Sequence, residues 1–183
     1  FNQTELQKAV LKNDVTTKAL KEAIAKGSSR NKWLVFCSGV EHAITCCETL
    51  NMLGIKTTVV HSNLSDNERD NAINGFKSGE FKAICNNNIL TVGFDCPEID
   101  LIVCLRPTMS VVLHVQMLGR GCRVHPSKKD TLVLDFAYNT QRLGCVNDPF
   151  LPKKKGSKAG ETPVKLCLAC QVYNHLSARV CIA

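Results

Sequence analysis

The sequence has few aromatic residues and no long apolar run. Of its 183 residues, 5% are Phe, Trp or Tyr, and no apolar stretch approaches the ~18–20 residues of a membrane-spanning helix. The first residues show no signal-peptide pattern. With 44% hydrophobic and 21% charged residues, the composition also excludes a disordered or collagen-like chain. We therefore expect a cytoplasmic protein of roughly single-domain size that has no membrane partner.

Two further absences concern nucleotide chemistry. The sequence contains no Gly-x-x-x-x-Gly-Lys-[Ser/Thr] loop and no Asp-Glu-x-Asp/His box, the segments that supply the phosphate cradle and the Mg²⁺ ligands of P-loop ATPases. We therefore predict that the chain alone does not hydrolyse ATP. No Gly-x-Gly-x-x-Gly follows a strand either, which disfavours a domain that binds a dinucleotide or a flavin.

The formal net charge of +7 comes mostly from the C-terminal part of the chain. Residues 151–183 contain six basic side chains and one acidic side chain, whereas the preceding residues are nearly balanced. The run Lys153–Gly160 is typical of a mobile basic linker. The sequence therefore predicts four parts: a helical segment at 1–30, an α/β domain at 31–147, a basic linker at 148–165 and a Cys-containing tail at 166–183.

Eleven cysteines are many for a chain of this length. Most stand in apolar segments such as Trp33–Cys37 and Leu101–Leu105, where Cys behaves as a small hydrophobic residue. An odd count in such segments disfavours a secreted disulfide framework and favours a reducing compartment. We expect eight cysteines to serve packing, and only the last three have a spacing that suggests a ligand set.

Strand and helix patterns alternate along the body of the chain. Short apolar runs indicate buried parallel strands, and Ser-x-x-Glu boxes at Ser38 and Ser65 predict helix starts. This alternation predicts a doubly wound parallel α/β sheet flanked by helices, with ligands at the carboxyl ends of its strands. The expected strands are Trp33–Cys37, Lys56–His61, Phe81–Cys85, Leu101–Leu105 and Thr131–Phe136. The segments expected at their carboxyl ends are Ser38-Gly39, His61–Leu64, Asn86–Pro97, Arg106–Ser110 and Phe136–Asn139.

The stretch Gln116–Arg123 is the most informative for function. Gly119 lets the backbone approach another surface, and Arg120 and Arg123 stand three residues apart, so both can face one anionic ligand through planar guanidinium groups. A surface turn with solvated arginines is the alternative. The loop that ends at Asp95 offers a carboxylate for a ribose hydroxyl or an arginine, and the alternative there is a turn that closes before Pro97.

The order and spacing of these segments resemble the second RecA-like domain of superfamily 2 helicases and translocases. Trp33–Ser38 looks like motif IV, Ile84–Asp95 like motif V and Gln116–Arg123 like motif VI. The resemblance covers residues 31–139. It is closest to phage and prophage DNA helicases related to the DEAD/DEAH group and to restriction-enzyme motors. The same RecA-like fold is therefore expected here.

The resemblance implies roles for these residues. Arg120 and Arg123 would be arginine fingers that reach the γ-phosphate of ATP across an interdomain cleft, with Gln116 at the same cleft. A first RecA-like domain, outside this chain, would hold most of the ATP and Mg²⁺. Gly93 and Asp95 would help to hold the nucleotide or would couple it to these arginines, and Gly119 would also contact the nucleotide.

The nucleic-acid backbone would be bound by Ser38, Gly39, His61, Asn87 and Thr91. DEAD-box proteins carry Thr at the position of Asn87, so its role departs from that pattern. DNA is expected rather than RNA, because RNA-directed members usually begin motif VI with His, whereas Gln116 stands here.

The tail contains the knuckle Cys167-Leu168-Ala169-Cys170, and Cys181 follows after ten residues. This spacing suggests a Zn²⁺ site with Cys167, Cys170 and Cys181 as ligands. A closed structural Zn²⁺ site needs four ligands, and a further Cys three positions after Cys181 would form a second Cys-x-x-Cys pair and complete the set. His175 between them is another candidate, and a metal-free tail is the alternative. A competing function for the whole chain is a non-catalytic nucleic-acid-binding module that uses the basic linker and this tail.

Overall fold

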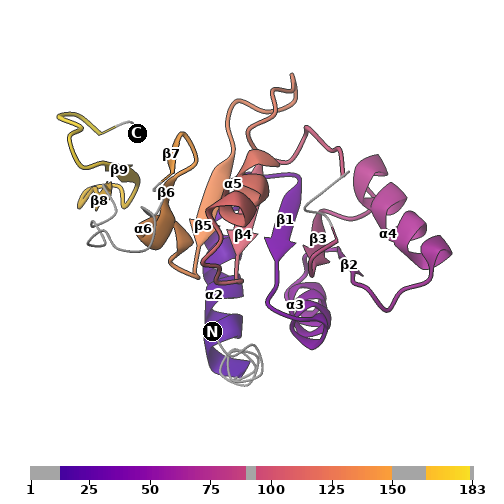
Figure 1. Ribbon diagram of the computed structural model, residues 1–183. Coiled ribbons are helices and arrows are strands. Elements are labelled where there is room, and N and C mark those ends of the chain that lie inside the picture. The colour runs from indigo at the N-terminus through magenta and orange to yellow at the C-terminus, as the bar shows by residue number, and fades with distance from the viewer. Residues whose placement is uncertain (1–12, 90–93, 150–163, 182–183) are drawn as a thin grey trace.

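A five-stranded parallel sheet forms the centre of the molecule (Figure 1). The computed structural model describes residues 13–89, 94–149 and 164–181. The strand order is β2-β3-β1-β4-β5, so the chain adds strands first on one side of β1 and then on the other. The strands are β1 (Trp33–Phe36), β2 (Thr57–Val60), β3 (Ala83–Asn86), β4 (Leu101–Cys104) and β5 (Leu132–Asp135). The predicted doubly wound α/β fold is confirmed, and every expected strand overlaps an observed one.

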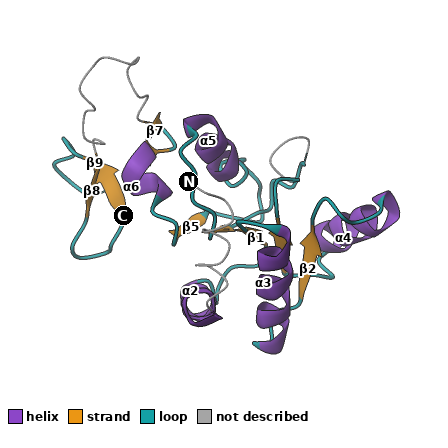
Figure 2. Ribbon diagram, turned by 60° about the horizontal axis from the view of Figure 1, so that its bottom comes forward, coloured by secondary structure: helices purple, strands orange, loops and turns teal. Residues whose placement is uncertain are grey.

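Helices cover both faces of the sheet (Figure 2). Helices α2 (Asn13–Lys26) and α3 (Val40–Met52) lie on one face, and α4 (Asp66–Ser78) and α5 (Val111–Gly119) lie on the other. Because consecutive strand residues point to opposite faces, Trp33 and Val35 pack towards α2 and α3, whereas Leu34 and Phe36 pack towards α4. A strand buried on both faces is apolar throughout, which is why the sequence shows these short unbroken runs.

The two expected capping boxes have different outcomes. Ser65 caps α4 with the full reciprocal arrangement to Glu68, as predicted. The box at Ser38 is wrong, because α3 begins after Gly39 and has no side-chain cap. The Ser38 hydroxyl instead donates to the Leu105 carbonyl at 3.0 Å. A tertiary hydrogen bond between the ends of β1 and β4 has replaced the local one.

Six of the cysteines are buried in the sheet and its helices, as expected of packing residues: Cys37, Cys46, Cys47, Cys85, Cys96 and Cys104. Cys145 is partly buried. Cys122 was also expected to pack, and this expectation is wrong, because Cys122 is exposed on the loop after α5. All eleven cysteines lie within the described residues and are free thiols.

A small annex follows β5. It consists of α6 (Asn139–Leu143), the hairpin β6 (Gly144–Cys145) and β7 (Asp148–Pro149), and a second hairpin of β8 (Val164–Leu166) and β9 (Tyr173–His175). The two hairpins lie side by side in both ribbon views (Figures 1 and 2). Among the described helices, none is long and apolar enough to span a membrane. The expected four-part division of the chain stays a prediction.

Candidate functional site

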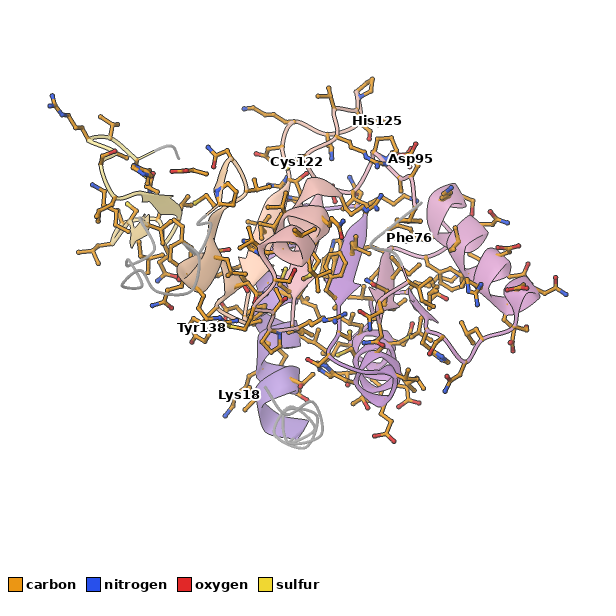
Figure 3. The ribbon with its side chains drawn as sticks, viewed as in Figure 1. Lys18, Phe76, Asp95, Cys122, His125 and Tyr138 are labelled. Atoms are coloured by element: carbon orange, nitrogen blue, oxygen red, sulfur yellow. The ribbon has the colours of Figure 1, made fainter. Side chains whose placement is uncertain are left out.

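The predicted site residues divide between the two opposite edges of the sheet. Gly121, which follows Arg120, is hydrogen-bonded through its carbonyl to Thr131, the residue before β5, and Thr131 also lies 3.1 Å from the carbonyl of Ile99, just before β4. The loop after α5 is therefore at the amino edge. Figure 3 shows Asp95, Cys122 and His125 together at that end, whereas Tyr138, which follows β5, lies at the other end.

Asp95 was expected at the carboxyl edge, and that expectation is wrong. The chain returns across the sheet between β3 and β4, so that Asp95 meets the loop after α5. There the Asp95 carboxylate forms an ion pair with Arg123, and the guanidinium of Arg120 donates to the backbone carbonyl of Phe94. The structure thus brings together three residues that sequence analysis assigned to one nucleotide site.

The loop that carries the two arginines is fixed to the sheet by Lys128 and Thr131. The Lys128 ammonium donates to the carbonyls of Ile99 at 2.6 Å and Gly121 at 2.7 Å, and the Thr131 hydroxyl reaches the same two carbonyls. Partial burial lowers the pKa of Lys128. No sequence pattern indicated Lys128, because its role depends on two backbone carbonyls that only the fold brings together.

The two arginines differ in how firmly they are held. Arg120 is half-buried, and burial, with the nearby charge of Arg123 as a second cause, lowers its pKa. Arg123 is more exposed: its side chain is 40% accessible, and that of its partner Asp95 is 73% accessible. Ion pairs between such exposed groups contribute ~0–1 kcal/mol. The Asp95–Arg123 contact is therefore weak enough to exchange for a more strongly charged ligand.

Gly119 and Gln116 lie beside these arginines. A Cβ built on Gly119 meets no atom within 4 Å, so the space over this residue is open. Gln116 is exposed on α5, one helical turn before Arg120, and therefore lies on the same side of that helix as the arginine. Both residues thus border the surface on which Arg120 and Arg123 stand.

The carboxyl edge gathers a second predicted group. The Asn87 side-chain amide donates to the Cys37 carbonyl at 3.1 Å, and its backbone N–H donates to the Val60 carbonyl, so Asn87 ties the ends of three strands together. Beside it, Ser38 and Gly39 precede the N-terminus of α3, a position that favours anions through its free backbone N–H groups.

His61 follows β2 at the same edge, but its ring is buried. Its Nδ1 accepts the backbone N–H of Asn63 at 3.3 Å, and its carbonyl accepts from Leu64. The ring thus organises the turn that leads into α4. Thr91 and Gly93 lie outside the described residues, so their predicted roles stay predictions.

Two further residues at the carboxyl edge, Arg106 and Asn139, were not among the predicted site residues. Arg106 follows β4 and donates to the side-chain oxygen of Asn88, and burial lowers its pKa. Asn139 is fully buried, donating to the Arg106 carbonyl at 2.8 Å and accepting from the Thr108 N–H at 2.9 Å. The only available signal was their position after predicted strands, which marked the segments without singling out the residues.

This geometry agrees with a comparison against known families. Residues 15–125, more than half of the chain, match the model of the helicase conserved C-terminal domain. The chain belongs to this helicase family. The resemblance to the C-terminal RecA-like domain of superfamily 2 helicases is therefore confirmed.

Two fungal relatives match most of the chain. A Schizosaccharomyces pombe protein named as the mitochondrial ATP-dependent helicase irc3 is 35% identical over 82% of the chain, and the Saccharomyces cerevisiae ATP-dependent helicase IRC3 is 36% identical over 80%. These matches cover 25% and 22% of the relatives, so the chain spans about a quarter of their length. The expected cytoplasmic location stays a prediction.

Solved structures show the same fold. A fragment described as an HsdR subunit of a type I restriction enzyme from Vibrio vulnificus YJ016 superposes with a TM-score of 0.66. It covers 77% of this chain and 30% of the other, at 22% identity. At this level of identity the similarity establishes the fold only.

Proposed function

We propose that this chain is the second motor domain of an ATP-dependent DNA helicase or translocase, and that Arg120 and Arg123 contact ATP bound mainly by a first RecA-like domain. The observation that carries the proposal is the gathering of Arg120, Arg123 and Asp95 at the amino edge by segments that are far apart in the sequence. A solvated surface turn would not need the partly buried hydrogen bonds by which Lys128 holds this loop.

The proposed role follows from the chemistry of phosphoryl transfer. Negative charge is spread over the oxygens of the transferred phosphoryl group, and a preorganised guanidinium stabilises it. Arg120 is held by the Phe94 carbonyl, whereas among the described residues Arg123 is paired only with the exposed carboxylate of Asp95. Arg123 can therefore exchange its partner for a phosphate when the two domains close, and Asp95 becomes available to a ribose hydroxyl. Mg²⁺ would be held with the ATP by the first domain.

The carboxyl edge is the proposed nucleic-acid surface. Ser38, Gly39 and Asn87 stand there with the N-terminus of α3, whose free backbone N–H groups can bind a backbone phosphate without reading sequence. Ser38 and Asn87, whose side chains donate to the Leu105 and Cys37 carbonyls, would hold this edge in the binding conformation. The buried ring of His61 would support this surface by shaping its turn, and Thr91 is proposed to border it. DNA is proposed because motif VI begins with Gln116. RNA is the competing outcome, because phosphate contacts alone do not distinguish the two sugars.

The arginines are tested in the protein that carries both motor domains. We expect Arg123→Ala to lower the rate of ATP hydrolysis about 10³-fold, the lower end for loss of an arginine finger, while affinity for single-stranded DNA changes less than about twofold. Arg120→Ala should lose as much. Lys129→Ala is the matched control, because Lys129 is an exposed cation on the same loop. ATPase turnover and DNA binding are measured on the same preparations.

Near-normal ATP turnover in both arginine variants would overturn the assigned role. The chain alone should show no turnover with or without DNA, because its sequence contains no phosphate loop. A deletion of the residues from Lys153 onward distinguishes the motor proposal from the alternative of a non-catalytic binding module. The motor proposal expects this deletion only to weaken DNA binding, and abolished binding would favour the module.

A further inference from the structure

No residue of the second hairpin of the annex belongs to either hydrophobic core of the described residues. The hairpin and the segment that follows it expose four large apolar side chains, and Leu168 and Val180 are 96% and 81% accessible. The other two are Leu166 and Leu176. A two-stranded hairpin is marginal in water without a core, and small modules of this kind are stabilised by disulfides or by a metal. Its cysteines are free thiols, so a disulfide does not supply that stability.

Backbone hydrogen bonds fix the Cys-x-x-Cys turn. The Cys167 N–H donates to the Val172 carbonyl at 2.9 Å, and the Gln171 N–H donates to the Cys167 carbonyl at 2.8 Å. Gln171 adopts a left-handed conformation with φ at 58°, an uncommon one for a residue with a side chain. These bonds close the turn tightly and bring Cys167 and Cys170 to the same side of the hairpin.

Cys181 returns to the same point from the end of the tail. The thiols of Cys167, Cys170 and Cys181 all lie within 4.8 Å of one another, and the sulfurs of Cys170 and Cys181 are 3.4 Å apart. Three sulfurs bound to one Zn²⁺ at ~2.3 Å in tetrahedral geometry would be about 3.8 Å apart. The Asn174 amide also donates to the Cys181 sulfur at 3.4 Å, the kind of contact that orients a metal ligand.

We propose that Cys167, Cys170 and Cys181 bind one Zn²⁺ ion, and that this ion stabilises the folded conformation of the hairpin. His175 is not the fourth ligand. Its Nε2 lies 3.1 Å from the Asp148 carboxylate and its Nδ1 lies 2.6 Å from the Ser177 hydroxyl, so both ring nitrogens are engaged elsewhere. His175 instead joins the hairpin to β7. Within the described residues the metal therefore has three protein ligands, and the fourth position of its tetrahedron stays open to a further ligand.

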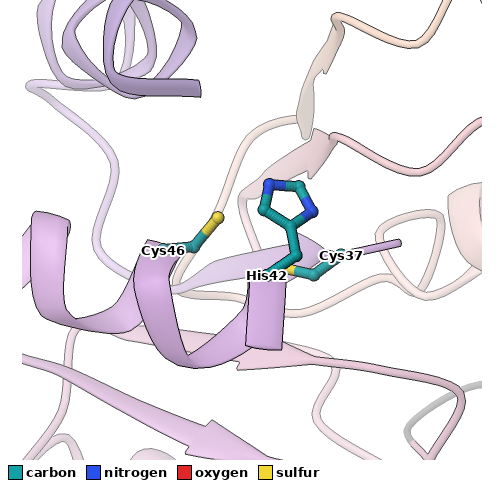
Figure 4. A group of neighbouring side chains, drawn as sticks. All are labelled: Cys37, His42 and Cys46. Carbon is teal, nitrogen blue, oxygen red and sulfur yellow. The ribbon is translucent and has the colours of Figure 1, made fainter. Parts of the chain in front are cut away.

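A second group of soft ligands in the chain does not fit a metal. Cys37, His42 and Cys46 also lie within 4.8 Å of one another, with His42 and Cys46 on α3 beside Cys37 (Figure 4). However, His42 Nδ1 accepts the Ser38 N–H at 3.2 Å, and Nε2 lies 3.4 Å from the Thr16 hydroxyl. Cys37 and Cys46 are also buried among apolar side chains, where the charge of a metal ion and its thiolates would be poorly solvated.

The two groups can be separated by measuring bound metal. The purified chain is saturated with Zn²⁺, passed through gel filtration and assayed for zinc. We expect about one zinc per chain. Cys170→Ser and Cys181→Ser should each lower the zinc affinity at least about tenfold, because each removes a direct ligand. Cys46→Ala, in the buried group, and Cys122→Ser, at an exposed cysteine outside both groups, should retain the zinc.

Cobalt supplies a second measurement. Co²⁺ bound to the hairpin thiolates should give sulfur-to-metal charge-transfer absorption that disappears in Cys170→Ser and persists in Cys46→Ala. Fluorescence of Trp33, the single tryptophan, shows in each variant that the RecA-like domain is folded. A wild-type chain without zinc after saturation would overturn the proposal. Zinc that persists in Cys170→Ser but is lost in Cys46→Ala would overturn it as well.

Discussion

Cys46 and Cys170 are the same kind of residue in two opposite settings. Each belongs to a group of three soft side chains whose ligand atoms lie within 4.8 Å of one another. Cys46 is fully buried between α3 and the sheet, whereas Cys170 is exposed on a hairpin without a core of its own. Convergence of ligand atoms is therefore not sufficient for a metal site. The buried group already has hydrogen-bond partners and packing, and the exposed group has a fold that still needs stabilising.

The same contrast recurs for other residue pairs. His42 is buried on α3, and His175 is exposed in the annex. Gly121 is packed against the start of β5, and Gly119 faces open space two residues away. In each pair the surroundings decide whether the residue serves the fold or remains available at the surface. Variants of the buried members should therefore affect stability more than variants of the exposed ones.

The largest expected effect concerns His42 in acid. Burial lowers its pKa to about 4 from an ordinary value of 6.5. Between these two pH values the His42 ring is protonated in the unfolded chain and neutral in the folded chain. Stability is therefore lost as the pH falls from about 6.5 to about 4, by about 3 kcal/mol in total. Urea unfolding at pH 7 and pH 4, followed by Trp33 fluorescence, measures this loss.

His42→Gln is the control for this prediction, since it removes the titration and keeps a side-chain acceptor for the Ser38 N–H. Burial lowers the pKa of His114 too, so the wild-type loss includes a second histidine. Subtracting the variant's loss from the wild-type loss isolates His42. An equal loss of stability in both proteins would show that His42 does not cause it.

The sheet was largely predictable from the sequence because its strands are buried on both faces. Runs such as Leu101–Cys104 have no polar position, which is typical of central parallel strands. The capping box at Ser65 was predictable because all its partners are local. The box at Ser38 was not, because the Leu105 carbonyl that competes for this hydroxyl comes from another strand.

The sequence singled out residues for the candidate site but did not predict where in the fold they lie. The arginine spacing identified Arg120 and Arg123, but the rule that ligands bind at the carboxyl ends of strands pointed to the wrong edge for Asp95. The crossing of the chain between β3 and β4 decides where this carboxylate lies, and it leaves no periodic pattern in the sequence. The role of Lys128 could not be predicted either, because this residue binds backbone carbonyls from two loops that only the fold brings together.

The glycines beside Arg120 provide the second test. A Cβ on Gly121 would lie 2.5 Å from Thr131 Cγ2 and 2.9 Å from Ile102 Cδ1, so Gly121→Ala should lower the free energy of unfolding by about 2 kcal/mol through overpacking. Gly119→Ala, with no atom within 4 Å of the new Cβ, should leave it unchanged or raise it by less than about 1 kcal/mol. Urea unfolding compares the two variants. Equal destabilisation would contradict the difference in packing.

The smallest expected effect concerns Cys46 and Cys170 themselves. Cys46→Ser places a hydroxyl among buried apolar side chains, and we expect it to lower the free energy of unfolding of the RecA-like domain by about 1 kcal/mol, because a hydroxyl loses more on desolvation than a thiol. Cys170→Ser should change it by less than about 0.5 kcal/mol, because Cys170 is exposed and outside this core. Trp33 lies within the same core as Cys46, so its fluorescence during urea unfolding follows this domain and not the hairpin. If Cys170→Ser destabilises the domain as much as Cys46→Ser does, the hairpin contributes to the stability of the core. Burial would then not explain how the two cysteines differ in their effect on the free energy of unfolding.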